Sequence, residues 1–254
     1  MAENEKIKIL EKGNIYFFYR PKVGVEHPEG ESQIQRFYLV LSPEGSSRFR
    51  LAIMGKKELP DPEISGKQRY WGHISTVKNS PKAIREELGP EKYETKTRGE
   101  RYIEAARPAG EGVYKIISHG RHTHLAYVLE LPQKPSNVQE ELNIESEASY
   151  IISVKNPSKP SPPGVGLSKG EAQFPKNLTE EFRGRRFSET DPPGFLDYQG
   201  AEFVLISASE DIKQELGTEI EKENETENKA DIFTDLRLNK KKHPVKPLFE
   251  GEWE

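Results

Sequence analysis

The sequence predicts an α+β protein that is mainly β, with a closed or half-closed sheet and a few short helices. Two observations lead to this class. Many short runs are rich in Tyr, Phe, Ile and Val and are bounded by Gly, Pro, Asn or Ser, as strands are. Several of these runs are apolar at consecutive positions, which is typical of strands covered on both faces. Because the helix signals are few and short, a sheet that closes on itself is the most economical way to cover the strands.

The expected strands follow one another along most of the chain. They are residues 14–20, 36–42, 48–55, 69–77, 101–107, 112–118, 123–131, 149–155 and 201–208. Two connections have the composition of hairpin turns, residues 42–47 with Pro and Gly, and residues 119–121 with a central Gly. The strands that flank these turns are expected to pair antiparallel.

Short helices are expected directly after three of the strands. They span residues 80–89, 136–143 and 209–217, and each begins with Ser and ends with Gly or Asn. A Ser side chain accepts the free N–H groups of the first turn, and Gly or Asn suits the left-handed backbone at a helix exit. A further short helix is expected at residues 177–182, with Gly184 at its end.

One folded body is expected over residues 8–217. It is followed by an acidic spacer, residues 218–229, and by a basic tail with an aromatic tip, residues 230–254. Residues 36–89 are expected to form a hairpin, a strand and a helix, and residues 112–155 a hairpin, a helix and a strand, so residues 8–98 and 99–217 are candidates for two related halves with a change of order. Duplication of one unit and coincidence both explain this similarity.

The composition limits the classes of function. The chain has 254 residues, of which 33% are hydrophobic and 31% charged, and this indicates a folded body with polar appendages. A formal charge of −4 favours neither nucleic acid nor an anionic membrane through bulk electrostatics. The absence of Cys excludes disulfides, thiolate metal sites and a Cys nucleophile. No signal peptide and no apolar run of the ~20 residues needed to cross a bilayer are evident, so a cytoplasmic protein without membrane contact is expected.

Basic residues alternate with aromatic residues in three segments, 48–50, 69–71 and 182–187, and the last is the richest. The planar guanidinium group of Arg binds phosphate oxygens through paired hydrogen bonds, and aromatic rings stack on unpaired bases. The alternative is that these arginines flank core aromatics and form ordinary ion pairs with nearby glutamates. The expected contacts to nucleic acid or another polyanion are Phe182, Arg183, Arg185, Arg186 and Phe187.

A group of histidines suggests a metal site near the hairpin turn at 119–121. His122 and His124 are two positions apart, so they point to the same side of a strand, and His119 approaches from the turn. With Glu111 or Glu130 as a further ligand, such a set would suit Zn or Fe. The alternative is a polar hairpin tip that uses His for hydrogen bonding or exposure.

Two other motifs are weaker. Gly166, Ser168 and Gly170 have the spacing of a nucleophile elbow, but a Pro-rich stretch stands where that elbow needs a strand, so a flexible glycine loop is expected. Asp191 and Asp197 would supply paired carboxylates, yet their Pro and Gly neighbours favour a role in turns. Neither motif identifies a reaction.

The C-terminal tail carries three apolar residues within a polar stretch, Leu248, Phe249 and Trp253. They either dock on the protein's own body or bind a protein partner, and such anchors would dominate either interface. Deletion of residues 230–254 is expected to destabilise the body only in the first case.

Four segments are similar to those of a known group of proteins: residues 13–21, 35–41, 124–131 and 196–206. The wording of these segments resembles a family of prokaryotic proteins with no assigned activity. This resemblance implies that residues 10–215 form one evolutionary unit, and it implies no mechanism.

The function expected from the sequence is that of a cytoplasmic binding or adaptor protein. Its basic–aromatic surface would contact nucleic acid or another polyanion. One alternative is a metal-dependent enzyme that uses the histidines at 119–124, and another is a structural protein that binds a partner through its tail. An enzyme is the less favoured class, because no motif identifies a reaction.

Overall fold

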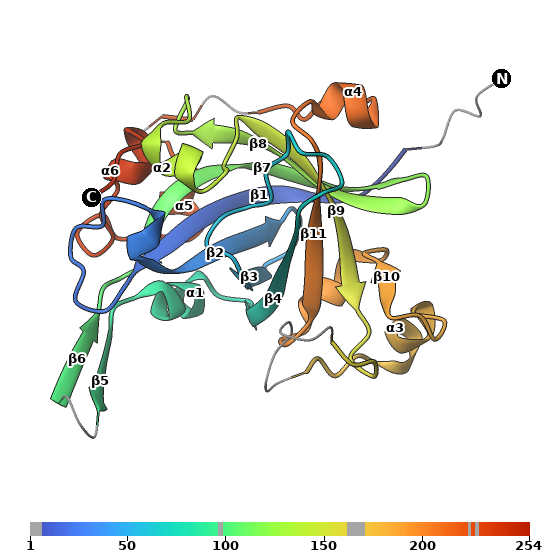
Figure 1. The fold of residues 1–254 in the computed structure, drawn as a ribbon, viewed down its shortest axis with the longest axis horizontal. Helices are drawn as coiled ribbons and strands as arrows, with labels where there is room; N and C mark the ends of the chain where they lie inside the picture. The colour runs from blue at the N-terminus through green and yellow to red at the C-terminus, as the bar shows by residue number, and fades with distance from the viewer. Residues whose placement is uncertain (1–6, 96–98, 162–170, 223–224, 227–228) are drawn as a thin grey trace.

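The computed structural model of the chain describes residues 7–95, 99–161, 171–222, 225–226 and 229–254. In this part of the chain, eight strands close into a barrel in which every neighbouring pair is antiparallel. In spatial order they are β9 (Glu147–Lys155), β11 (Glu202–Ser209), β4 (Arg69–Lys78), β3 (Phe49–Met54), β2 (Ile34–Pro43), β1 (Lys8–Pro21), β7 (Arg107–His119) and β8 (His122–Leu131). Pairing of β8 with β9 closes the ring (Figure 1). The expected mainly-β fold with a closed sheet and few short helices is confirmed.

Short elements surround the barrel. They are the two-stranded ribbon β5 (Glu91–Thr95) and β6 (Gly99–Ile103), the short strand β10 (Phe187–Glu189), the single turns η1 (Glu31–Gln33) and η2 (Pro193–Asp197), and the helices α1 (Pro81–Leu88), α2 (Asn137–Glu141), α3 (Lys176–Glu181), α4 (Ile212–Leu216), α5 (Asp231–Thr234) and α6 (Lys246–Phe249). The ribbon of β5 and β6 projects away from the barrel at the lower left of Figure 1. Strand β10 pairs with the last three residues of β9, and β8 pairs with its first half, so β10 continues the line of β8.

Both halves of the body contribute four strands. Residues 8–98 supply β1 to β4 as consecutive antiparallel neighbours, and residues 99–217 supply β7, β8, β9 and β11 in the same way. The halves meet where β1 pairs with β7 and where β4 pairs with β11. A short helix follows the last strand of each half, α1 after β4 and α4 after β11. Whether this likeness comes from duplication stays a prediction.

Strand β1 shows why consecutive apolar residues mark a strand that is buried on both faces. Ile15, Phe17 and Tyr19 point into the barrel and belong to the interior core, whereas Tyr16 and Phe18 point outward into a second apolar cluster. All five side chains are completely buried. Burial of one such side chain contributes roughly 1.5–3 kcal/mol to folding, so both layers stabilise the barrel.

The helix ends follow the expected chemistry with three exceptions, the first of which is Ser80, whose side chain makes no capping hydrogen bond at α1. Ser136 and Gln139 form a reciprocal capping box at α2, and Gly217 ends α4 in the left-handed conformation at φ 63°. At α4, however, the side chain of Asp211 accepts the Gln214 N–H, so Asp211 is the cap and not the expected Ser209. Gly89 after α1 has φ −67°, so the expected left-handed exit is wrong there.

The C-terminal tail folds back onto the outer face of the barrel. Ile232, Leu236 and Leu248 are fully buried and join Tyr16 and Phe18 in the outer apolar cluster. Self-docking is therefore the arrangement that the structure shows for this segment.

Every helix in the described part of the chain is too short or too polar to span a lipid bilayer.

The three apolar tail residues differ in their environment. Leu248 is fully buried, and Phe249 is partly buried against the outer cluster. Trp253 is also partly buried, with its ring 5.1 Å from the ring of Tyr19, and its Nε1 donates to Glu141 at 3.1 Å. Recognition of a protein partner through these residues stays a prediction.

Candidate functional site

A tight turn carries the three arginines that follow α3. The N–H of Arg185 donates to the carbonyl of Phe182 at 2.7 Å, and the intervening Arg183 and Gly184 have φ values of 48° and 74°. Left-handed backbone is uncommon for a residue with a side chain and is retained only where the surroundings enforce it. Residues 183–186 are termed the arginine turn below.

Asn156 holds the arginine turn from the end of β9. It is 3% exposed, and its backbone N–H donates to the carbonyl of Arg186 at 2.8 Å. Its side-chain Nδ2 donates to the carbonyl of Arg185 at 3.0 Å. The backbone of the turn is therefore fixed, so its side chains project from a preorganised base.

Phe182, the residue directly before the arginine turn, anchors the turn to the interior core. Its ring is fully buried, 5.8 Å from the ring of Phe174 and 5.2 Å from that of Phe195. The expectation that Phe182 stacks on a base is therefore wrong, because its ring belongs to the interior core of the protein.

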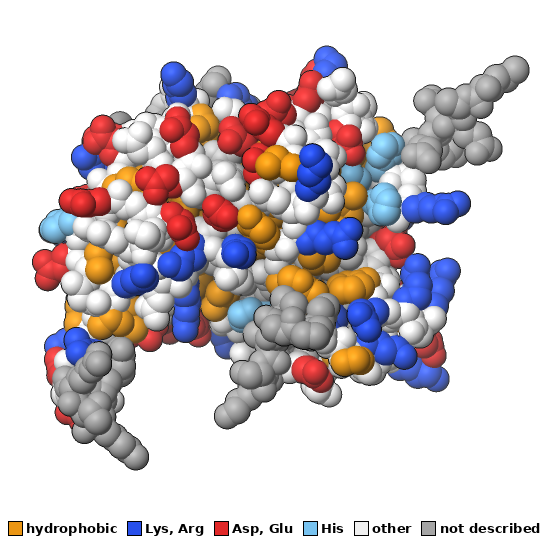
Figure 2. Space-filling view, in the orientation of Figure 1, with side chains coloured by type: hydrophobic (Ala, Val, Ile, Leu, Met, Phe, Trp, Pro, Cys, Tyr) orange, Lys and Arg blue, Asp and Glu red, His pale blue; other side chains and the backbone are white. Residues whose placement is uncertain are grey.

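The three arginines are not equivalent. Arg185 forms an ion pair with Glu189 at 3.2 Å, with about half of its side chain (49%) exposed. Arg183 and Arg186 are exposed, and in the described part of the chain neither forms an ion pair or a side-chain hydrogen bond. Lys and Arg side chains gather over α3 and β10 at the lower right of Figure 2. Two guanidinium groups, Arg183 and Arg186, are therefore available to an anion.

An aromatic pair lies directly after the arginine turn. The rings of Phe187 in β10 and Trp71 in β4 are 5.7 Å apart, and both side chains are half-buried. They point away from the barrel interior, and so does Arg69, which is exposed and lies two positions from Trp71 on the same strand. Arg69, Trp71, Arg183, Arg186 and Phe187 form the arginine–aromatic surface.

The three histidines lie on one face of the β7–β8 hairpin. His119 pairs with His122 across the turn, and the rings of His119 and His124 are 6.0 Å apart. His124 is buried with its Nδ1 3.1 Å from Ser149 Oγ, whereas His122 is exposed. Among the described residues, no three His, Asp or Glu side chains are placed to hold a metal ion. A Zn or Fe site at these histidines stays a prediction.

His124 is kept neutral by its surroundings. Burial lowers its pKa to about 4, and the charges of His119 and His122 lower it further in the same direction. A neutral imidazole that contacts a Ser hydroxyl fits the alternative interpretation, in which the hairpin uses His for hydrogen bonding.

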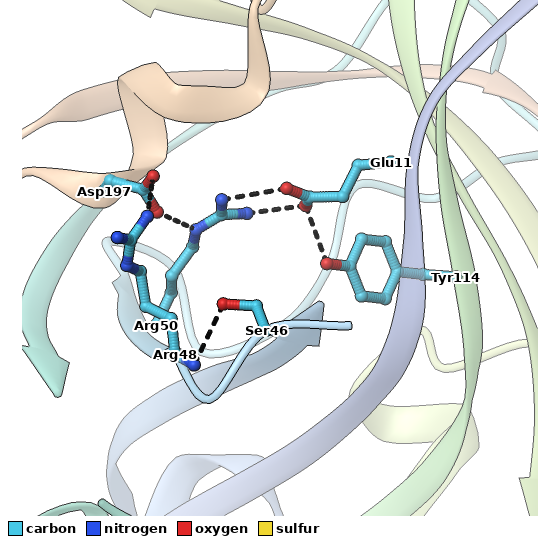
Figure 3. A network of polar contacts seen from close by, with 6 residues as sticks. All are labelled: Glu11, Ser46, Arg48, Arg50, Tyr114 and Asp197. Carbon is cyan, nitrogen blue, oxygen red and sulfur yellow. Dashed lines mark hydrogen bonds and ion pairs between the residues drawn. The ribbon is translucent and has the colours of Figure 1, made fainter. Parts of the chain in front are cut away.

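A polar network closes one end of the barrel (Figure 3). Both Nη atoms of Arg50 donate to Glu11, at 2.6 and 2.9 Å, and its Nε donates to Asp197 at 2.8 Å. Arg48 also pairs with Asp197, and the hydroxyl of Tyr114 donates to Glu11 at 2.7 Å. Burial alone would lower the pKa of Arg50, but the hydrogen bonds and charge of Glu11 raise it, so the guanidinium stays charged.

This network has a consequence for two motifs. Arg48 and Arg50 are paired with carboxylates, Arg50 in the interior and Arg48 at the surface, so the basic segment 48–50 does not belong to the arginine–aromatic surface. Asp197 serves as an ion-pair partner, whereas Asp191 is exposed.

A groove of about 1490 Å³ opens beside the network, with charged side chains of both signs along its walls. Its mixed charge favours no single class of ligand. The motif of Gly166, Ser168 and Gly170 lies outside the described residues.

Comparison with family models, with curated proteins and with solved structures produced no match. The resemblance to a prokaryotic family stays a prediction.

Two residues that shape this surface, Asn156 and Trp71, could not be assigned to it from the sequence. Asn156 directly precedes a Pro-rich stretch, and only the fold brings it under the arginine turn. Trp71 lies 116 positions before Phe187 (187 minus 71), and their contact depends on the pairing of β4, β11, β9 and β10. The basic–aromatic wording of segment 69–71 was the available signal for Trp71.

Proposed function

We propose that this protein is a cytoplasmic binding protein that contacts nucleic acid or another polyanion through the arginine–aromatic surface. One observation carries the proposal. Two exposed guanidinium groups, unpaired among the residues that the structure describes, project from a fixed turn directly beside a half-exposed pair of aromatic rings. Guanidinium groups bind phosphate oxygens by directed hydrogen bonds, and aromatic faces accept unpaired bases.

Binding through this surface is short-ranged. The chain has a formal charge of −4, so the protein as a whole repels a polyanion at a distance. Arg183 and Arg186 act once contact is made, and each phosphate they neutralise releases counterions. The interaction is therefore expected to be of modest affinity and sensitive to salt.

Charge reversal of the two free arginines tests the proposal. The double variant Arg183→Glu/Arg186→Glu is expected to weaken binding of a fluorescein-labelled single-stranded oligonucleotide by about tenfold or more, measured by fluorescence anisotropy. Heparin serves as the second polyanion, without bases.

A matched control separates the surface from net charge. Lys78→Glu/Lys82→Glu changes the formal charge by the same amount at exposed positions on β4 and α1. The control is expected to bind as the unmodified protein does. Equal loss in both variants, or no loss in the arginine variant, would remove the arginine–aromatic surface as the binding site.

A further inference from the structure

Arg107, at the start of β7, is a buried cation without a counter-charge. It is 3% exposed, and its Nη2 donates to the carbonyl of Glu26, a neutral acceptor. In the described part of the chain, its Nε and Nη1 have no hydrogen-bond partner. Burial of a charge costs free energy unless the group is paired and hydrogen-bonded, so this arrangement calls for an explanation.

Other buried cations of the protein show how such groups are normally accommodated here. Arg50 pairs with Glu11 and Asp197, and Lys155 pairs with Glu202 at 3.0 Å. Arg20 uses all three nitrogens, on the Tyr38 hydroxyl and on backbone carbonyls, and it lies 3.7 Å from Glu91. Arg107 differs from all of them, because two of its three nitrogens are left without an acceptor.

The fold places Arg107 inside the barrel, at the end opposite the network of Figure 3. It lies beside Tyr19 on β1, which in turn lies beside Phe37 on β2, so these three side chains form a row across neighbouring strands. The Tyr19 hydroxyl lies near the Arg107 guanidinium and the backbone of Glu254, yet among the described residues it makes no well-aligned hydrogen bond. Burial raises the pKa of Tyr19, and the charge of Arg107 opposes that rise, so this hydroxyl is a neutral donor beside the guanidinium.

Two segments cover this end of the barrel, and Glu141 holds both. Its Oε2 accepts the N–H of Glu31 at 2.7 Å, at the start of η1, and its Oε1 accepts Nε1 of Trp253 at 3.1 Å. The ring of Trp253 lies 5.1 Å from that of Tyr19. The cover therefore depends on one side chain of α2, and the Trp253 ring packs directly against the row that contains Arg107.

We propose that Arg107 and Tyr19 form an internal anion-binding site for the carboxylate of a small monoanionic molecule, reached when the cover of residues 251–254 moves. The guanidinium supplies one positive charge and two free N–H donor nitrogens, and the phenol supplies a third donor. One positive charge balances a monoanion and leaves a dianion such as phosphate uncompensated. The rings of Tyr19, Phe37 and Trp253 suit an apolar body attached to the carboxylate.

Glu254 is the competing explanation. Its charge contributes to the raised pKa of Tyr19, so its carboxylate lies near this end of the barrel. It accepts the backbone N–H of Lys246 at 3.3 Å, and the structure gives no ion pair between Glu254 and Arg107 among the described residues. Arg107→Met and Glu254→Gln distinguish an internal ion pair from a site that takes an external anion.

The first test compares the stability of variants without any ligand. If Arg107 lacks a counter-charge, Arg107→Met unfolds at the same or a higher temperature than the unmodified protein, whereas Arg50→Met, its matched control, unfolds at a lower one. A fall in the unfolding temperature of Arg107→Met, matched by Glu254→Gln, would assign Arg107 to Glu254 and overturn the proposal.

The second test measures binding with benzoate as the probe. In a Trp71→Phe background, Trp253 is the remaining Trp, so its fluorescence reports on the cover. Benzoate is expected to change this fluorescence along a saturable curve, and the change is expected to be at least tenfold weaker with Arg107→Met. A saturable response that persists in Arg107→Met, a response to phosphate in place of benzoate, or no response to either anion would contradict the site. Neither test measures binding at the arginine–aromatic surface, so their outcomes are independent of whether the protein binds a polyanion.

Discussion

Phe182 and Phe187 both flank the arginine turn, yet one is a core residue and the other a surface residue. Their sequence environments are alike, since each stands next to an Arg. The difference comes from Phe174 and Phe195, which pack on Phe182, and from Trp71, which packs on Phe187 at the surface. Such distant contacts are set by the fold, so the sequence alone assigned both rings to the binding surface.

Removal of the Phe182 ring is expected to affect mainly stability, and removal of the Phe187 ring mainly binding. Phe182→Ala leaves a cavity in the interior core and is expected to lower the free energy of unfolding by about 3–5 kcal/mol in chemical denaturation. Phe187→Ala is expected to lower it by less and to weaken binding of a single-stranded oligonucleotide while binding of heparin is kept. Loss of heparin binding in Phe187→Ala would show that this ring does not act by stacking.

His124 makes the stability of the protein depend on pH in the acidic range. Its pKa is lowered from 6.5 to about 4, mainly by burial and also by His119 and His122. The unfolded chain therefore binds a proton that the folded protein excludes, so stability is complete above pH 6.5 and falls as the pH drops towards 4. The loss is on the order of 2–3 kcal/mol across this range.

A neutral replacement tests the contribution of His124. In His124→Gln, the free energy of unfolding is expected to change less between pH 6.5 and pH 4 than in the unmodified protein, measured by urea denaturation. The same dependence on pH in both proteins would assign it to another group, such as His243, whose pKa is also lowered by burial.

At the scale of elements, the docking of α5 depends on one buried carboxyl group. Glu111 of β7 is 1% exposed and accepts the backbone N–H groups of Asp231 at 2.9 Å and Ile232 at 3.0 Å. Burial raises its pKa to about 8, against the effect of these two hydrogen bonds, and the charges of Asp231 and Glu225 add to the rise. The docked tail therefore favours protonated over ionised Glu111.

The docked tail is accordingly expected to loosen in alkali. A raised pKa contributes stability that is complete below pH 4.5 and is lost as the pH rises through about 8. Hydrogen-exchange protection of the α5 amides is expected to fall above pH 8 in the unmodified protein. In Glu111→Gln, which stays neutral, the protection factors are expected to be independent of pH, and an equal fall in both proteins would contradict this role of Glu111.

The elements differ in how far the sequence predicted them. The barrel strands and the helices α1 to α4 were predicted from apolar runs and from the residue types at helix ends, because these are local signals, although the exact cap at α4 and the exit of α1 differ. Strand β10 has three residues and exists only because it pairs with β9, and the ribbon of β5 and β6 is rich in charged residues. The network of Figure 3 escaped prediction for the same reason, since Glu11, Arg50 and Asp197 come from three distant parts of the chain.

At the scale of the whole molecule, that network ties the two halves of the barrel together at one end. Arg50 and Glu11 belong to the first half, whereas Tyr114 and Asp197 belong to the second. The ion pair between Arg50 and Glu11 is largely shielded from water, since only 3% of the Arg50 side chain is exposed. Removal of Arg50 therefore leaves the charge of Glu11 uncompensated. Arg50→Met is expected to lower the free energy of unfolding by about 3–5 kcal/mol in chemical denaturation.

A compensated variant provides the control for that prediction. Arg50→Met combined with Glu11→Gln removes both charges of the pair, so part of the stability is expected to return. If the double variant is as unstable as the sum of the two single variants, the charges contribute independently and the network does not act as a unit.

The binding surface is likewise a property of the whole fold, because β4, β10 and the arginine turn meet only in the closed barrel. Its contribution is measured most directly by the salt dependence of oligonucleotide binding. The logarithm of the association constant is expected to fall linearly with the logarithm of salt concentration, and Arg183→Glu/Arg186→Glu is expected to reduce the slope by about two. An unchanged slope and affinity in that variant, or no saturable binding by the unmodified protein, would contradict the account.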